Sequence, residues 1–306
     1  MRFLVVCDVD SASVAKLAEK YVCGSVDGVK PEFDAVILLG PFVGSSPYLA
    51  SPEGEAAAEG EMGSLIAQLE NIVCRVVYLP SSSDPIRSVT DQLHLTPNSV
   101  NIHARAMPLI DGLYIAGFTE LKSNILDDQS GIDSDDEDVD SAHVQTCSSA
   151  RIMDDVLSKA PAYCYPNGNI RGSGIFLFNY KYVHTLNHFL SYQHDLVSRA
   201  AVKLAVIPIV PINDDKNTLS GNTLRLPASY GGLKIASPKS LRKVGGYTVV
   251  EMVRNVSDGL WHVSEVSDCW LDRKSDTTGL SSCVEDAPMA GQTRENMSNE
   301  SYKTDR

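Results

Sequence analysis

The sequence contains no run of apolar residues approaching the ~20 that a membrane-spanning helix needs. Its first residues are apolar for too few positions before Asp8 to form the core of a signal peptide. The seven cysteines are odd in number, widely scattered and never in a Cys-x-x-Cys arrangement, which argues against a disulfide framework or a zinc knuckle. We therefore expect an intracellular protein, cytoplasmic or nuclear, without membrane association.

Basic residues are scarce relative to acidic ones. The chain of 306 residues has 26 Lys and Arg against 39 Asp and Glu, a net charge of −13 and a pI near 4.9. A strongly acidic protein is repelled by phosphate backbones and anionic membranes. The composition therefore argues against nucleic-acid binding by the chain alone.

Much of the acid lies in one segment that has no Lys or Arg from Ser123 to Ala150. Its acidic residues are Asp127, Asp128, Asp133, Asp135, Asp136, Glu137, Asp138 and Asp140. High charge without hydrophobic periodicity is typical of disorder, so we predict a disordered acidic insert over residues 122–149. Within it, Ser134 precedes four acidic residues, which makes it a candidate phosphorylation site for an acidophilic kinase; a merely solvated linker is the alternative.

The first part of the chain has an alternating strand and helix pattern. Short apolar runs at residues 2–7, 33–39 and 75–79 predict buried strands, and helical periodicity at 14–22 and 62–73 predicts the helices between them. Residues 44–58 carry turn formers without a period and are predicted to be a loop. This order implies a parallel sheet with right-handed crossovers.

The second part of the chain is predicted to be rich in strands. Apolar runs flank a hairpin signal at Asp111-Gly112, and later runs are found at 174–178, 204–207, 233–236, 247–253 and 260–263. A helix is predicted over residues 183–196. The polar end has no hydrophobic period, so we predict one domain over residues 1–270 and a disordered tail over 271–306.

Polar groups and breakers follow the first three predicted strands. Asp8-Val9-Asp10 follows the first, Gly40-Pro41 the second, and Pro80 to Pro85 the third. Ligand sites of open α/β sheets gather at the carboxyl ends of the strands. We therefore expect any functional site at the edge where these three strands end.

These strand ends resemble those of the calcineurin-like metallophosphoesterases over most of residues 1–266. Leu79-Pro80 and Asp84-Pro85 look like the flanks of the family's Pro-Gly-Asn-His-Asp-Pro motif. Residues 235–241 resemble its Asn-Pro-Gly-Ser-Leu turn, and Gly246-Tyr247 its following Gly-Tyr strand. The resemblance implies an α/β fold, a four-layer α-β-β-α sandwich of two mixed sheets flanked by helices.

The family hydrolyses phosphoesters with two metal ions about 3.5 to 4 Å apart, held by Asp, Asn and His side chains. Only Asp8 matches the family at a ligand position. Asp84 keeps the place of the aspartate that orients the catalytic His, and Asp10 and Asn179 could coordinate weakly through oxygen. The other degenerate positions carry side chains that are poor ligands or cannot ligate at all: Pro41, Ser82, Ser83, Pro208 and Val210.

The resemblance therefore implies a chain that has kept the fold, has lost two-metal hydrolysis and acts as a binding or scaffold module for a protein partner. No cofactor is expected beyond a single weakly bound divalent metal. In that case we expect Asp8 and Asp10 to accept backbone N–H bonds where the first strand turns into the following helix.

Two alternatives remain open. One is a divergent metal-dependent phosphoesterase, a phosphoric ester hydrolase with a residual metal site. The other is a scaffold akin to the B subunits of replicative DNA polymerases, which residues 38–46 and 80–84 resemble. Histidines at 184 and 188 lack the Glu of a His-Glu-x-x-His pattern, and the serines at 81–83 lack a Gly-x-Ser-x-Gly turn, so we assign neither group a catalytic role.

Overall fold

The computed structural model describes residues 1–22, 32–42, 51–73, 75–85, 95–120, 155–156, 172–180, 189–191, 197, 201–208, 229–230 and 232–271. The predicted acidic insert, Val210 and the residues from 272 onward lie outside this set.

The first sheet has six strands in the order β12-β11-β1-β2-β3-β4. Their bounds are Arg2–Cys7 (β1), Ala35–Leu39 (β2), Val76–Leu79 (β3), Ser99–Asn101 (β4), Gly246–Arg254 (β11) and Trp261–Trp270 (β12). β1 to β4 run parallel, whereas β11 pairs antiparallel with both β1 and β12. The strand that opens the chain thus lies in the middle of the sheet, between β2 and β11.

The second sheet also has six strands, in the order β5-β6-β7-β8-β10-β9. Their bounds are Arg105–Ile110 (β5), Leu113–Thr119 (β6), Ser173–Asn179 (β7), Val202–Val206 (β8), Ser229–Tyr230 (β9) and Leu233–Ala236 (β10). The inner strands β6, β7, β8 and β10 are parallel, and the outer strands pair antiparallel. Both sheets are therefore mixed.

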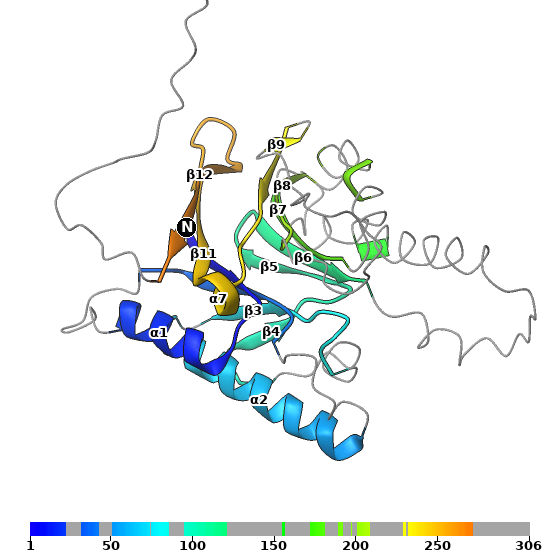
Figure 1. Cartoon of the computed structure of the whole chain (residues 1–306). Helices are drawn as coiled ribbons and strands as arrows, with labels where there is room; N and C mark the ends of the chain where they lie inside the picture. The colour runs from blue at the N-terminus through cyan, green and yellow to red at the C-terminus, as the bar shows by residue number, and fades with distance from the viewer. Residues whose placement is uncertain are drawn as a thin grey trace, which may run out of the picture. The chain divides into compact units, whose positions relative to one another are not determined.

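The two sheets face each other across a shared apolar core. Side chains of β1, β2 and β3 on one side, and of β6, β7 and β8 on the other, form one buried cluster. The helices α1 (Ser11–Val22) and α2 (Pro52–Glu70) cover the outer face of the first sheet through a second cluster (Figure 1). Helical residues Val156 and Phe189 pack on the outer face of the second sheet. This arrangement confirms the predicted α-β-β-α sandwich of two mixed sheets flanked by helices.

The predicted loop over residues 44–58 is wrong in its second half, because α2 begins at Pro52. The Ser51 hydroxyl caps the helix by accepting from the Gly54 N–H at 3.1 Å. Proline suits the first helical position, and the first turn holds two glutamates that favour the positive end of the helix dipole. The cap, the proline and the glutamates explain why the helix begins here, although its first turns have no hydrophobic periodicity.

The hairpin prediction at Asp111-Gly112 is confirmed, with Gly112 at φ 74° between β5 and β6. Most of the helix predicted over 183–196 lies outside the described residues. Within that range, residues 189–191 are described, and they are helical.

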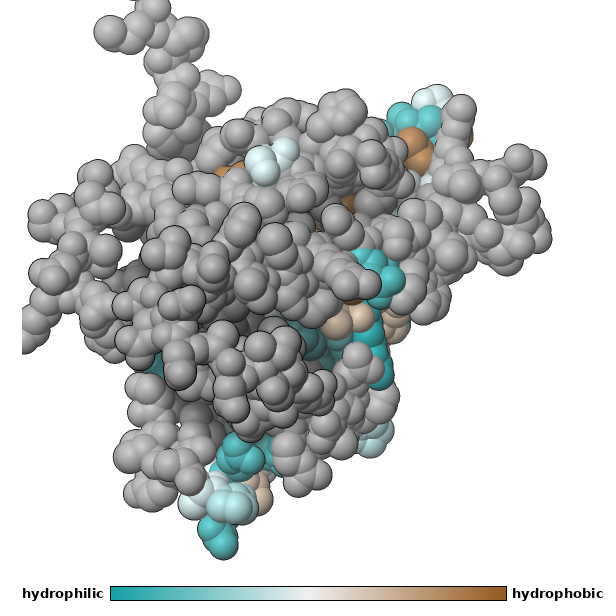
Figure 2. All heavy atoms as spheres, turned by 90° about the vertical axis from the view of Figure 1, so that its right-hand side faces the viewer, coloured by the Kyte–Doolittle hydropathy of each residue, from teal (hydrophilic) through white to brown (hydrophobic). Residues whose placement is uncertain are grey.

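Within the described part of the chain, no helix is both long and apolar enough to cross a membrane. On the face shown in Figure 2, the described residues reach the surface in small separate groups, hydrophilic ones beside single apolar ones. Among the described residues, the most exposed large apolar side chains are Ile110, Val244 and three valines of the hairpin that β11 and β12 form, Val253, Val256 and Val266. Single exposed apolar residues are ordinary for a protein surface.

Candidate functional site

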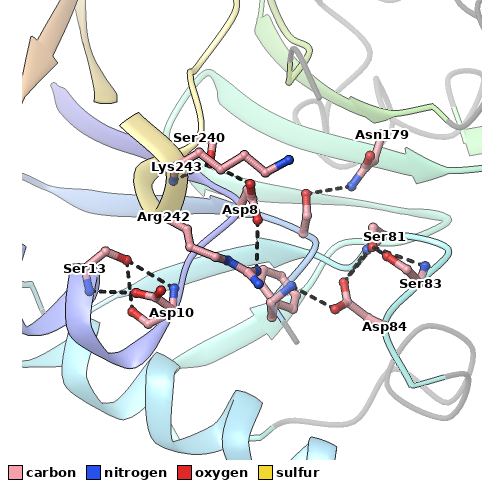
Figure 3. Close-up of polar contacts among 12 residues, drawn as sticks. Asp8, Asp10, Ser13, Ser81, Ser83, Asp84, Asn179, Ser240, Arg242 and Lys243 are labelled. Carbon is pink, nitrogen blue, oxygen red and sulfur yellow. Dashed lines mark hydrogen bonds and ion pairs between the residues drawn. The ribbon is translucent and has the colours of Figure 1, made fainter. Parts of the chain in front are cut away.

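The carboxyl ends of strands from both sheets meet at one edge, which we call the rim. It comprises the residues that follow β1, β2, β3, β7, β8 and β10. Asn179 at the end of β7 donates from Nδ2 to the Gly40 carbonyl at 3.4 Å and so joins the two sheets there. Figure 3 shows Asp8, Asp84 and Asn179 around this edge. The predicted convergence of the first three strand ends is confirmed.

Asp8 is a buried carboxylate of the rim, with 4% of its surface exposed. Its Oδ1 lies 2.9 Å from Nη2 of Arg242, and its Oδ2 accepts a hydrogen bond from the Ser240 hydroxyl at 2.6 Å. Asp8 adopts φ 48°, a left-handed conformation that is strained for a residue with a side chain. The prediction that Asp8 accepts backbone N–H bonds is wrong, because its partners are two side chains.

Both partners of Asp8 come from the short helix α7 (Leu241–Val244) and its cap. Ser240 caps this helix, since its hydroxyl oxygen accepts from the Lys243 N–H at 2.9 Å while it donates to Asp8. The Arg242 N–H donates to the Asp8 carbonyl at 2.9 Å. Gly245 ends the helix at φ 64°. The helix is thus fixed to the end of β1 by backbone and side chain together.

Asp10 caps α1, as predicted. Its Oδ1 accepts from the Ser13 N–H at 2.8 Å, and the Ser13 hydroxyl donates to the Asp10 carbonyl at 3.0 Å. Burial alone would raise the pKa of Asp10, but the hydrogen bonds from Ser13 and the charges of Arg242 and Lys16 hold that pKa below its ordinary value. The Asp10 carboxylate is therefore ionised and bound to the backbone at the start of α1.

Asp84 ties the segment after β2 to the segment after β3. Its Oδ1 accepts from the Phe42 N–H at 2.8 Å, and its Oδ2 accepts from the N–H and the hydroxyl of Ser81 at 2.7 Å and 3.0 Å. The Ser83 and Ser81 hydroxyl oxygens lie 2.8 Å apart. A side chain at Gly40 would come within 2.3 Å of the Asp84 carboxylate, so only glycine fits this contact. Ser82 lies half-buried in the same turn.

The rim does not fit a two-metal centre. Pro41 and Pro208, which follow β2 and β8, have no side-chain donor atoms, and the sequence puts Val210 at a further ligand position. Asn179 has its carboxamide turned to the Gly40 carbonyl. Among the residues that the structure describes, no group of three or more His, Cys, Asp or Glu side chains is placed to hold a metal ion. Both carboxylate oxygens of Asp8 and of Asp84, and Oδ1 of Asp10, already have protein partners.

A buried histidine, His103, lies beside the rim after β4. Its Nδ1 accepts from the Thr119 N–H at 3.1 Å, so the proton of the neutral ring is on Nε2. The ring stacks on Phe118 with centroids 5.9 Å apart. Burial lowers the pKa of His103 to about 4. The residue is therefore uncharged at neutral pH and offers no positive charge to a ligand.

Cys7 is buried at the end of β1, and its thiol donates to the Pro238 carbonyl at 3.2 Å. Burial raises the pKa of this thiol well above its ordinary value, so it stays neutral. Cys7 therefore packs as a small, uncharged residue at the end of its strand.

Comparison of the sequence with protein-family models and with curated proteins finds no match. Among solved structures, the chain is similar to the protein TT1561 of Thermus thermophilus, with a TM-score of 0.47 and 13% sequence identity over 88% of this chain and 98% of that chain. A likeness at this level assigns neither a family nor a function.

Sequence reasoning missed Arg242, the only basic side chain that forms an ion pair with Asp8 in the described structure. The sequence does show Ser240 ahead of a short helix, which is a capping signal. It gives no sign that the second residue of that helix turns toward β1, because this depends on how α7 packs on the end of the first strand.

Proposed function

We propose that the chain is a binding or scaffold protein built on a fold of the calcineurin-like metallophosphoesterase type, and that it does not hydrolyse phosphoesters. One observation carries the proposal. At the rim the carboxylates of Asp8, Asp10 and Asp84 are each held by protein groups, and proline stands at the ends of β2 and β8. Two-metal hydrolysis needs free ligands at these places.

The test measures metal content and turnover in the same preparation. Purified protein is analysed for manganese, zinc and iron, then incubated in manganese with an aryl phosphate and an aryl phosphodiester. We expect no stoichiometric metal pair and no turnover above buffer. Two equivalents of metal, with turnover that Asp8→Ala abolishes, would instead establish the divergent hydrolase. We propose no cofactor; at most one divalent ion would bind weakly.

The two stretches that resemble the B subunits of replicative DNA polymerases meet at the rim, where the Phe42 N–H of one donates to the Asp84 carboxylate of the other at 2.8 Å. This contact is compatible with any scaffold function on this fold. The partner in our proposal is a protein. A stoichiometric protein partner that co-purifies with the chain and rebinds the purified chain supports this function, and a chain that binds no protein argues against it.

In this proposal residues 1–270 are the binding domain, and the insert 122–149 and the tail 271–306 are acidic or polar tethers. Phosphorylation of Ser134 would add about 1.5 to 2 negative charges to the insert and speed its encounter with a basic partner. The binding rate should then fall steeply as salt is added.

A further inference from the structure

The buried carboxylate of Asp8 needs groups around it that stabilise its negative charge. The residue is 4% exposed, and an ionised carboxylate in such a place is stable only beside a cation or several donors. The Ser240 hydroxyl supplies one donor, to Oδ2. The other oxygen, Oδ1, needs a positive group.

Arg242 supplies that group through an ionic contact. Its Nη2 lies 2.9 Å from Oδ1, yet within the described structure neither Nη2 nor Nε of Arg242 makes a directed hydrogen bond. The attraction is therefore mainly that of two charges at short range. The Arg242 side chain is 26% exposed and that of Asp8 5%, so water screens the pair only in part. A guanidinium stays charged at every pH at which the protein is folded.

Two further carboxylates of the rim lie near the pair. Asp10 lies near enough to Arg242 for the guanidinium to lower its pKa, and Asp84 holds the next strand ends. Lys243 is exposed and has no ion pair among the residues described; Figure 3 shows its side chain extending from α7 along the rim. Without Arg242 the rim would keep the carboxylates of Asp8, Asp10 and Asp84, with Lys16 acting on Asp10 and Lys243 exposed nearby. Asp8 itself would then have no ion-pair partner among the described residues.

We propose that Arg242 is a built-in replacement for a metal cation: its guanidinium neutralises Asp8 at the place where the resembled family binds a metal, and so keeps divalent ions away from this aspartate. The inference rests on the proposed loss of the metal pair and adds the means by which the fold does without it. The folded chain then needs no divalent cation and gains nothing from one. Removing the guanidinium should open a weak cation site at Asp8.

The test compares the wild type with Arg242→Gln, and uses Lys243→Gln as the matched control at the neighbouring exposed cation. Bound manganese is measured from the electron paramagnetic resonance of free Mn²⁺, and the melting temperature is recorded in EDTA and in Mn²⁺. Wild type and Lys243→Gln should melt at the same temperature in both. Arg242→Gln should melt about 5 °C lower in EDTA, recover part of the loss in Mn²⁺, and bind Mn²⁺ about tenfold more tightly than the wild type does.

Further variants keep the test decisive. In Asp8→Asn/Arg242→Gln the buried charge is gone, so the gain in Mn²⁺ binding should disappear. If Arg242→Gln does not fold, Arg242→Met removes the charge and takes its place, whereas Arg242→Lys keeps a positive charge and should bind no more Mn²⁺ than the wild type. The inference is overturned if the charge-removing variant gains no Mn²⁺ binding, if the double variant retains the gain, or if the wild type is itself stabilised by Mn²⁺. Turnover of phosphoesters by the wild type would count against the proposed function, whereas an inert wild type with a manganese-insensitive Arg242→Gln would overturn this inference alone.

Discussion

The stability of the fold should depend on pH through His103. The ring is 7% exposed, accepts from the Thr119 N–H and has a pKa lowered by burial from 6.5 to about 4. A protonated ring could not accept that hydrogen bond, and its charge would lie in an apolar place. Folding therefore selects the neutral form, whereas the unfolded chain takes up a proton near pH 6.5.

The sign of the effect follows from the lowered pKa. Above pH 6.5 the ring is neutral in both states, and the stability is fully present. As the pH falls from 6.5 toward 4, only the unfolded state gains the proton, so the free energy of unfolding decreases. A difference from 6.5 to about 4 corresponds to a total loss of roughly 3 kcal/mol, of which about 2 kcal/mol falls between pH 6.5 and 5.

Urea unfolding at several pH values measures this loss. His103→Gln can keep an acceptor but cannot be protonated, so its free energy of unfolding should change by about 2 kcal/mol less than that of the wild type between pH 6.5 and 5. Equal slopes for wild type and His103→Gln would refute the reasoning.

Four further predictions concern the rim and the insert. The first three are changes in the free energy of unfolding, measured by urea unfolding. Gly40→Ala should lower it by about 3 kcal/mol, because the new methyl group would lie 2.3 Å from the Asp84 carboxylate. Asp84→Ala should lower it by about 3 kcal/mol, since buried N–H groups lose their acceptor, while Ser82→Ala in the same turn should change it little. Asp10→Ala should lower it by about 1 kcal/mol, because α1 loses its cap. Deleting residues 123–149 should leave the melting temperature nearly unchanged, as expected of a tether.

Each of these has a result that would count against it. A Gly40→Ala variant as stable as the wild type would show that the two segments can separate without cost. Equal losses for Asp84→Ala and Ser82→Ala would mean that the turn, and not the carboxylate, is what matters. An Asp10→Ala variant with unchanged stability would show that another group caps α1. A deletion that unfolds the domain would show that the insert is a structural element.

The sheets were predictable because their signals are local. The apolar run that ends at Gly40 and the Asp111-Gly112 turn each settle a strand end within a few residues, and both appear where expected. α2 was predicted too short, because its first turns carry alanine, glycine and glutamate rather than an apolar stripe. Its start depends on capping and on packing at Ala58, which hydrophobic periodicity does not register.

The site was predictable in its positions but not in its contacts. The sequence places Asp8, Pro41 and Asp84 at adjacent strand ends, as observed. Which groups these carboxylates meet depends on tertiary approach. Arg242 reaches Asp8 only because α7 packs on the end of β1, and Asp84 reaches the Phe42 N–H only because Gly40 has no side chain.

The position of β1 between β2 and β11 also governs how the chain can fold during synthesis. β2 leaves the ribosome soon after β1, but β11 ends only at Arg254. Pairing of strands so distant in sequence is slow, because a very long loop must close before the hydrogen bonds form. One edge of β1 therefore stays unpaired for most of translation, and the first sheet reaches its final strand order only after nearly all of the described chain has been made.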